Sequence, residues 1–325
     1  MDVHVPDREV QVEHGARICR GVGWGCQHGH RMTRDALDDE ASIVSVRARK
    51  SRSLIRRTSR GRRGGDPGFP TRLLPTRGIV RGDAPMTEVA RGVGAPFEAL
   101  SERYDAWYDA PAGRVLLDLE VATLRPLLHE TRGPRLEVGV GSGRFAAALD
   151  VEFGVDIAFS PLVYAARRGL HVVRGSGERL PFADHVFGAV VLVATLCFVD
   201  KPRVVLRETR RVLGPGGRLV VAIVPRDSTW GQRYQVMGRQ GNPFYRHAHL
   251  YTIDELAGLL SDEGFTIVIG RSTLFQRACD EPCFEAVRDG ALEDAGFVAL
   301  AAMVTESPPI DGRRIPVEAE PRRRS

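Results

Sequence analysis

The chain has 325 residues, of which 43% are hydrophobic and 27% charged, a composition that fits one large globular domain or two small ones. Its formal net charge of +5 comes from the two ends of the chain. Residues 1–85 hold 17 basic and 10 acidic side chains, and residues 313–325 hold five basic and two acidic ones. Residues 86–312, by contrast, hold 24 basic and 29 acidic side chains. The acidic middle argues against a polyanion-binding groove there, and the five cysteines, mostly far apart, imply no disulfide framework.

The first 85 residues show no sustained hydrophobic period, and residues 47–78 are rich in Arg, Ser, Gly and Pro. Such a composition cannot bury enough apolar surface to offset the ordering entropy of the chain. We expect residues 1–85 to be a disordered extension, with two alternatives: a basic arm for nucleic acid or an anionic membrane, or an upstream stretch that is not translated, with Met86 as the true start. Residues 306–325 are expected to form a flexible basic tail.

The beginning of the chain lacks the cationic and apolar pattern of a signal peptide. The longest apolar run, at 189–199, is too short to span a bilayer and suits a buried strand. These features predict a cytoplasmic protein without membrane contact. Cys19, Cys26, His28 and His30 lie near one another in the sequence, but they lack the paired spacing of zinc ligands, so no metal site is predicted.

From residue 96 on, the hydrophobic pattern predicts regular elements. Two amphipathic helices are predicted over 96–113 and 113–130. Strands are then predicted at 135–140, 152–158, 170–175, 186–196, 218–224, 265–272 and 296–304, and helices at 144–149, from Ser160, at 202–213 and at 252–264. The alternation predicts an α/β domain over residues 86–305, with a doubly wound, mostly parallel sheet of seven strands. Because no full crossover helix separates the last two strands, the last is expected to be an antiparallel insertion at the edge.

Residues 136–146, LEVGVGSGRFA, join the first of these strands to a helix. A dinucleotide-binding turn has a third glycine at its sixth position, where this chain has Arg144. A phosphate-binding P-loop needs a lysine followed by Ser or Thr, which this loop lacks. The remaining pattern is an acid followed by alternating glycines: Glu137, Gly139, Gly141 and Gly143.

This pattern resembles motif I of the class I S-adenosylmethionine-dependent methyltransferases. Asp156 ends the next strand, 13 residues after Gly143, where that family has an acid that pairs with both ribose hydroxyls. The segments GSGERLPFADHVFGAVV (175–191) and RETRRVLGPGGRLVV (207–221) are similar to later parts of the family pattern. The resemblance covers roughly residues 97–305 and is greatest to the ubiquinone/menaquinone-type group, which acts on small molecules.

The resemblance implies S-adenosylmethionine as the cofactor and a Rossmann-like methyltransferase fold. Glycines would remove side chains where the cofactor lies, and the following helix N-terminus would offer its positive dipole to the methionine carboxylate. Thr195 ends the central strand, where open α/β sheets place ligands. The candidate cofactor residues are Glu137, Gly139, Gly141, Gly143, Asp156, Gly177, Glu178, Tyr104 and Thr195. For Tyr104, ordinary helix packing is an equal alternative.

The candidates on the acceptor side are Tyr245, His247 and His249, in the segment that covers the cofactor cleft in related folds. A histidine there could take up a proton near neutral pH, although surface or capping roles compete with this interpretation. Three functions stay open: a methyltransferase with a small-molecule acceptor, an RNA or protein methyltransferase that uses the basic arm, and a non-catalytic regulatory protein that binds S-adenosylmethionine. The first is favoured, with no nucleic-acid partner expected.

Overall fold

The computed structural model describes residues 79–81, 88–278 and 281–305. They belong to the second of two units into which the chain divides, Pro70–Ser325. Most of the predicted extension, including Cys19, Cys26, His28 and His30, and the predicted tail lie outside the described residues. The division at residues 85 and 305 stays a prediction.

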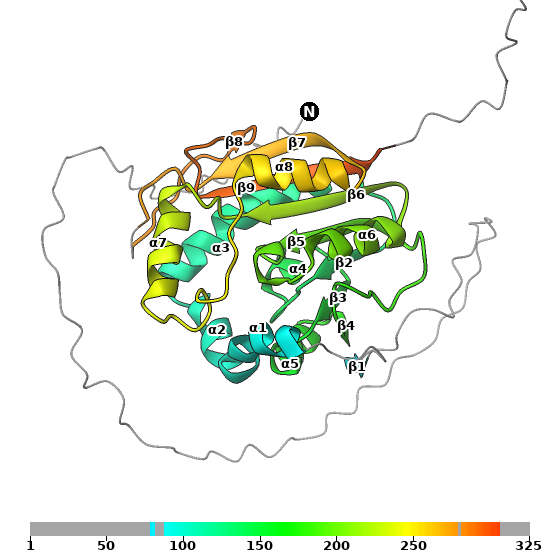
Figure 1. Cartoon of the computed structure of the whole chain (residues 1–325), viewed down its shortest axis with the longest axis horizontal. Helices are drawn as coiled ribbons and strands as arrows, with labels where there is room; N and C mark the ends of the chain where they lie inside the picture. Colours follow the sequence, from blue (N-terminus) through cyan, green and yellow to red (C-terminus); the bar gives the residue numbers. More distant parts are fainter. Residues whose placement is uncertain (1–78, 82–87, 279–280, 306–325) are drawn as a thin grey trace, which may run out of the picture. The chain divides into compact units, whose positions relative to one another are not determined.

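Within the described residues, the core of this unit is a nine-stranded sheet in the order β1-β4-β3-β2-β5-β6-β9-β7-β8 (Figure 1). The strands are β1 (Ile79–Arg81), β2 (Arg135–Val138), β3 (Phe153–Asp156), β4 (His171–Arg174), β5 (Phe187–Val193), β6 (Leu213–Ile223), β7 (Phe265–Thr273), β8 (Arg288–Asp289) and β9 (Phe297–Val304). Strands β1 to β6 pair in parallel, whereas β9 runs antiparallel to β6 and β7. This arrangement confirms the mostly parallel sheet with antiparallel pairing toward one edge. The structure adds short strands β1 and β8, and it inserts β9 between β6 and β7 rather than outermost.

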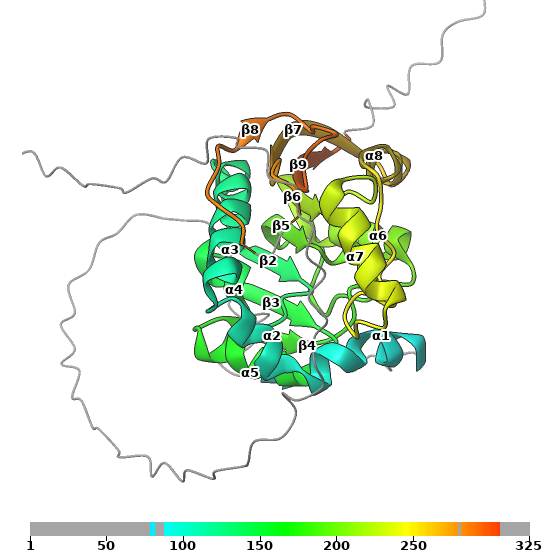
Figure 2. The same cartoon turned by 90° about the vertical axis from the view of Figure 1, so that its left-hand side faces the viewer.

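Helices cover both faces of the sheet, as a doubly wound fold requires (Figure 2). The helices are α1 (Glu88–Ala99), α2 (Ser101–Trp107), α3 (Pro111–Leu124), α4 (Arg144–Ala148), α5 (Phe159–Arg167), α6 (Pro202–Val212), α7 (Thr229–Arg239) and α8 (Ile253–Asp262). Buried residues of α3, α4 and α5 form one hydrophobic core, and those of α6 and α8 form the other. In β5, Val190 and Leu192 point into the second core and Ala189 and Val191 into the first, because side chains alternate along a strand.

Three helical features differ from the expectations. The predicted helix 96–113 is divided between α1 and α2, and Pro111 starts α3, a position where its missing N–H costs nothing. Helix α5 starts at Phe159, and its first backbone N–H groups are capped by the carboxylate of Glu98 rather than by Ser160. Helix α7 was not predicted; its signal is Ser228, whose hydroxyl accepts a hydrogen bond from the Gly231 N–H at 3.0 Å.

Helices α1, α2 and α7 lie at the end of the sheet where the parallel strands finish (Figures 1 and 2). No helix among residues 88–278 and 281–305 has the length and apolar character needed to cross a bilayer. The fold thus leaves one end of the sheet for a site, between the strand ends and these three helices.

Candidate active site

A cavity of about 530 Å³ opens at the carboxyl ends of the parallel strands. Open α/β sheets place their ligands at this end. Residues directly after β2, β3, β4, β5 and β6 form its floor: Gly139, Ile157, Gly175, Ala194 and Val224. Side chains of α1, α2, α3 and α7, and of the segment after α7, form its walls. The cavity therefore combines the loop of the glycine motif with groups from distant parts of the chain.

The glycine loop approaches the cavity as bare backbone. Gly139 has a φ of 78°, and a Cβ atom at this position would lie 2.5 Å from Cγ2 of Thr195. Gly141, with a φ of 52°, also lines the cavity. Gly143 has a different role, because its Cβ would lie 2.9 Å from that of Ala165 in α5. Gly143 does not line the cavity and packs closely against α5, and the cofactor contact predicted for it stays a prediction.

Asp156 lies in the cavity wall at the end of β3. Its Oδ2 accepts a hydrogen bond from the Gly141 N–H at 2.8 Å, and its Oδ1 accepts one from the Ala158 N–H at 2.8 Å. Burial raises the pKa of this carboxyl, and the backbone hydrogen bonds oppose that rise. Since each carboxylate oxygen accepts more than one hydrogen bond, Asp156 can bind hydroxyl groups of a ligand while it holds the loop.

Glu137 and Thr195 both line the cavity beside the glycine loop. Glu137 is 2% exposed, and its Oε2 atom is buried without a hydrogen-bond partner among the described residues. Burial raises the pKa of this carboxyl well above its usual range. The Thr195 hydroxyl lies 2.9 Å from the Val138 carbonyl oxygen, to which it can donate. Thr195 therefore links the ends of β5 and β2, and Glu137 offers an unused polar atom to a ligand.

Gly177 and Glu178 follow β4 and complete this side of the cavity. A Cβ atom at Gly177 would lie 2.9 Å from Cγ1 of Val138, so the backbone passes close to β2. The Glu178 carboxylate lies 3.9 Å from the Lys201 ammonium, which is largely exposed. Of the nine predicted cofactor residues, all but Gly143 thus line one cavity.

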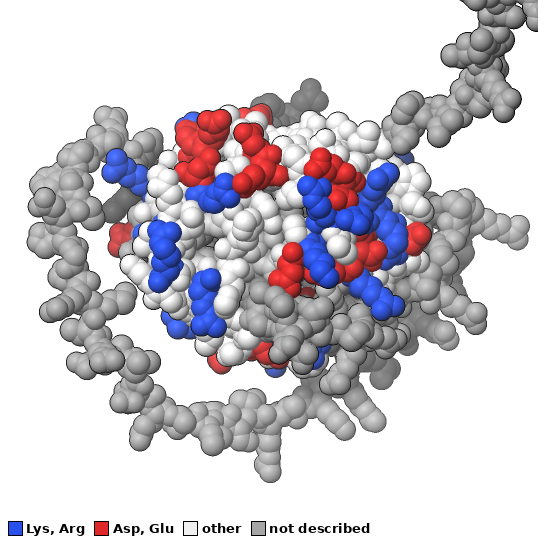
Figure 3. Space-filling view, viewed as in Figure 1, with Lys and Arg blue, Asp and Glu red and all other residues white. Residues whose placement is uncertain are grey.

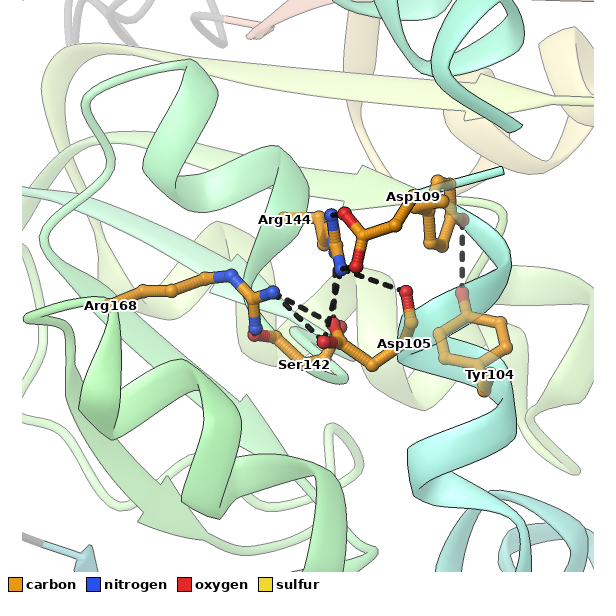
Figure 4. A network of polar contacts seen from close by, with 7 residues as sticks. Tyr104, Asp105, Asp109, Ser142, Arg144 and Arg168 are labelled. Carbon is orange, nitrogen blue, oxygen red and sulfur yellow. Dashed lines mark hydrogen bonds and ion pairs between the residues drawn. The ribbon is translucent and has the colours of Figure 1, made fainter. Parts of the chain in front are cut away.

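Arg144, which replaces a fingerprint glycine, fixes α2 against the glycine loop (Figure 4). Its guanidinium donates to both carboxylate oxygens of Asp105 and of Asp109, at distances of 2.8 to 3.0 Å. Arg168, after α5, also donates to Asp105, at 3.0 Å, and to the backbone carbonyl of Ser142, at 2.8 Å. Burial opposes ionisation of Asp105, but the hydrogen bonds from Arg144 and Arg168 prevail and lower its pKa to about 2.

This clamp holds an aromatic wall over the loop. Tyr104 on α2 approaches Gly141, where an added Cβ atom would lie 3.8 Å from Cε1 of the ring. The Tyr104 and Tyr108 hydroxyls are 3.2 Å apart. Across the cavity, the rings of Tyr234 and Tyr245 are stacked with centroids 4.3 Å apart. These side chains line the cavity, so its outer half is mainly aromatic.

Glu120 is a cavity residue that the sequence reasoning missed. It lies on α3 with Ala112 and Leu116, which also line the cavity, and the spacing of four residues places all three on one helix face. Burial raises the pKa of Glu120 to about 8. The signal in the sequence is a single acid on the apolar face of an amphipathic helix.

The three predicted catalytic residues do not come together. Tyr245 lines the cavity, whereas His247 and His249 are exposed and lie outside its lining. The His247 Nε2 accepts a hydrogen bond from Arg246 at 2.9 Å, and the His249 ring packs edge-on against Tyr251. Neither imidazole lines the cavity, and the role of a histidine as a base stays a prediction.

The chain matches known proteins over this region. Residues 136–221 match the model of a methyltransferase domain family. An uncharacterized protein of Mycobacterium tuberculosis is 46% identical over 218 residues, which cover 67% of this chain and 76% of the relative. A demethylmenaquinone methyltransferase of Corynebacterium kroppenstedtii is 29% identical over 142 residues, which cover 42% of this chain and 62% of that enzyme.

A solved structure extends the match to the fold. It is a SAM-dependent methyltransferase of Thermotoga maritima, described as a possible histamine N-methyltransferase, with 32% identity and a TM-score of 0.60. The match covers 65% of this chain and 98% of that one. The predicted resemblance is thereby confirmed, and the chain belongs to the class I S-adenosylmethionine-dependent methyltransferases, enzymes that use S-adenosylmethionine as their methyl donor.

Proposed function

We propose that the protein methylates a small molecule that binds beside S-adenosylmethionine in the cavity at the strand ends. The observation that carries this proposal is the cavity itself, a space of about 530 Å³ enclosed by the glycine loop on one side and aromatic side chains on the other. Pockets of this size and lining are typical of small-molecule sites. A macromolecular acceptor would need a site open to a large surface.

The residues at the inner half of the cavity fit the cofactor. Asp156 offers carboxylate oxygens to the two ribose hydroxyls, and the bare backbone at Gly139 and Gly141 leaves room for the methionine part. The unpartnered Oε2 of Glu137 can accept a hydrogen bond from the methionine ammonium. Gly177 and Glu178 lie on the side where the adenine would bind. This assignment places the methyl group toward the aromatic half.

The surface supports a small acceptor over a nucleic acid. Figure 3 shows basic and acidic side chains intermixed on one face of the molecule. Three of the arginines of α6 are paired with acids: Arg203 with Asp262 at 2.7 Å, Arg207 with Glu263 at 3.0 Å and Arg211 with Glu208 at 2.8 Å. Phosphate backbones bind best to unpaired cations. The names of the Thermotoga and Corynebacterium relatives also refer to small acceptors, histamine and a quinone precursor.

Bound S-adenosylmethionine supplies a methyl group on a positively charged sulfur. The chain's task is then to orient an acceptor in line with that methyl group, to exclude water and to remove a proton where the acceptor has one. The clamp formed by Arg144, Asp105 and Arg168 fixes α2 over the loop, which serves the first two tasks. Tyr104 and Tyr108 contribute apolar ring faces that close the space around the acceptor.

The test is calorimetric titration of the full chain with S-adenosylmethionine. Asp156→Ala is expected to weaken binding by about 1–3 kcal/mol, or roughly 5- to 150-fold, because hydrogen bonds to the ribose are lost. Asp118→Ala, which removes an exposed carboxylate of α3, is the control and should leave the affinity unchanged. Thermal unfolding of each variant checks that the fold is retained. Absence of binding by the wild-type chain would contradict the proposal.

A further inference from the structure

We infer that the methyl acceptor is a small amine, which binds as its ammonium ion to the carboxylate of Glu120 within a tyrosine cluster. The cluster consists of Tyr104 of α2, Tyr108 directly after α2, Tyr234 of α7, and Tyr245. The inference rests on the proposed function, since it names the class of the acceptor for the same cavity. It draws on the position of Glu120, on its lack of a partner and on the rings around it.

Glu120 is placed to meet a ligand. It belongs to the face of α3 that carries Ala112 and Leu116 into the cavity wall. The neighbouring positions Leu119 and Thr123 are buried in the protein core. A leucine or methionine at position 120 would continue this apolar surface at lower cost, because an ionised carboxylate pays for its loss of water. We therefore attribute the acid at this position to a ligand that enters the cavity.

Glu120 has no hydrogen-bond or ion-pair partner among the described residues. Arg103 and Asp200 of the lining also lack one, but both are exposed to solvent. The Asp156 carboxylate accepts two backbone hydrogen bonds, and Glu178 lies 3.9 Å from Lys201. Arg144 is held by Asp105 and Asp109, and the Arg233 guanidinium donates to the Ala278 carbonyl oxygen at 3.2 Å. A cationic ligand would supply the counter-charge that Glu120 lacks.

The surrounding rings favour a cation as well. The Tyr234 and Tyr245 rings are parallel within 8°, and Tyr104 packs edge-on against Tyr108 with centroids 5.6 Å apart. The faces of aromatic rings attract ammonium groups. Burial is the main cause that raises the pKa of all four tyrosines, and the charge of Glu120 adds to the rise in each, as expected of a carboxyl that lines the same cavity.

The remaining charged groups near the cluster include Glu137 and Asp156, whose charges act on Tyr104, and Arg233, whose charge acts on Tyr234. Two further cations of the lining are Arg144, whose guanidinium lies 5.7 Å from the centroid of the Tyr108 ring, and the exposed Arg103. None of them contributes to the pKa of Glu120, which is raised by burial alone. An uncharged acceptor such as a quinol would leave this carboxyl without a counter-charge. An ammonium ion satisfies the carboxylate and the rings together, and for this reason we favour the amine over the quinol.

The transfer step balances with the groups present. A primary ammonium first gives one proton to the Glu120 carboxylate, which leaves a nitrogen lone pair. The nitrogen then forms the bond to the methyl carbon while the carbon–sulfur bond breaks and its electron pair stays on sulfur. The product is a methylated ammonium and S-adenosylhomocysteine, and the proton held by Glu120 passes to water. Glu120 thus binds the acceptor and accepts its proton.

The experiment compares amines with alcohols of the same carbon skeleton. Benzylamine, 2-phenylethylamine and butylamine, each paired with its alcohol, are titrated into the full chain saturated with S-adenosylhomocysteine. At least one amine is expected to bind about tenfold or more tightly than its alcohol, because of the ion pair and the ring faces. Glu120→Gln should reduce that ratio to roughly twofold or less, and Asp118→Asn, on the exposed face of α3, should leave it unchanged.

A second readout follows from the ionisation of Glu120. Amine binding at pH 7 is expected to release a proton, seen as a binding enthalpy that depends on the buffer, because a carboxyl of pKa about 8 is mostly protonated before the ammonium enters. Glu120→Gln removes this release. Equal affinities for all amines and alcohols, or a ratio that Glu120→Gln does not change, would overturn the inference.

The two proposals fail in different ways. A wild-type chain that binds no S-adenosylmethionine refutes the proposed function, whatever the amines do. A chain that binds the cofactor and methylates uncharged phenols or quinols but no amine refutes only the inference. A Glu120→Gln variant that loses cofactor affinity while keeping the amine-to-alcohol ratio would show that Glu120 holds the methionine ammonium instead, which also overturns it.

Discussion

Asp156 and Glu120 both face the cavity, but only Asp156 receives hydrogen bonds from the chain. Burial raises the pKa of both carboxyls. In Asp156 the N–H groups of Ala158 and Gly141 offset part of that effect, whereas nothing offsets it in Glu120. Glu120 is therefore a group that lowers the stability of the empty protein when it ionises, a cost that is common at binding sites.

The destabilising effect of ionised Glu120 can be tested by replacing this one residue. Because the pKa of Glu120 in the folded chain is raised from 4.5 to about 8, its contribution to stability is complete below pH 4.5 and is lost as pH rises through 8. Glu120→Gln is expected to stabilise the empty protein by up to about 5 kcal/mol at pH 9 and by almost nothing at pH 4.5. Urea unfolding at both pH values measures the difference. A gain that is the same at both would contradict the raised pKa.

Sequence reasoning found Asp156 and missed Glu120 for a physical reason. The position of Asp156 follows from the strand pattern, since an acid at the end of the second strand lies at the ligand edge of any parallel sheet. The role inferred for Glu120 depends on Tyr234 and Tyr245, which lie more than a hundred residues later in the chain. Only the packing of α3 and α7 around one cavity brings them together.

At the scale of elements, α2 depends on charge for its position. It has seven residues and no side-chain N-cap, so its own helical stability is small. Asp105 and Asp109 join it to Arg144 at the first turn of α4, and Asp105 also joins it to Arg168 after α5. The Asp105 and Arg144 side chains are 10% and 14% exposed. The ion pairs of Asp105 are therefore largely buried, whereas the Asp109 side chain is 60% exposed. The clamp holds the aromatic wall of the cavity mainly through Asp105.

Breaking the clamp should damage both stability and cofactor binding. Asp105→Asn leaves two guanidinium groups without a full counter-charge and is expected to cost about 3 kcal/mol in the free energy of unfolding. Affinity for S-adenosylmethionine should fall as well, because Tyr104 is carried by α2. Arg226→Met, which breaks an exposed pair with Glu255, is the control and should cost less than about 1 kcal/mol. Denaturant unfolding and calorimetry measure the two effects, and equal costs for both variants would contradict the role of the clamp.

The pH dependence of the clamp has a defined direction. The pKa of Asp105 is lowered from 3.8 to about 2, so its stabilising effect is present above pH 3.8 and is lost as pH falls toward 2.

The structure gives a reason for Arg144 at the position where the dinucleotide fingerprint has its third glycine. A glycine at that position of the fingerprint could not reach α2, and the close packing against α5 is provided by Gly143 one residue earlier.

At the scale of the whole molecule, the hydrophobic pattern predicted the succession of the seven main strands along the chain and helices on both faces of the sheet, but not the position of β9 inside the sheet. Alternation of apolar residues with a period of two or near four is a local property, so it can be read from short windows. The short strands β1 and β8, with three and two residues, carry too little pattern to be found. Helix α7 was missed because glycines at 231 and 238 weaken its signal.

The proposed function also makes a prediction for a shortened chain. Residues 79–305 are expected to bind S-adenosylmethionine as tightly as the full chain, because the lining residues of the cavity lie between Gly94 and Phe297. Methyl transfer to a small acceptor should depend little on salt, since no polyanion is bound. Calorimetry and assays at about 50 and 200 mM salt compare the two chains. A steep salt dependence that the shortened chain loses would favour RNA as the acceptor and the basic arm as its binding site.

Because β9 lies between β6 and β7, the outer part of the sheet can form only late in the synthesis of the chain on the ribosome. Strand β7 leaves the ribosome first but can join the sheet only through β9, which ends at Val304. Until then the outer edge of β6 stays unpaired, a state that invites pairing with other chains. Phe297, at the start of β9, also closes the cavity wall. The nascent chain therefore cannot complete its active site before nearly all of this domain has been synthesised.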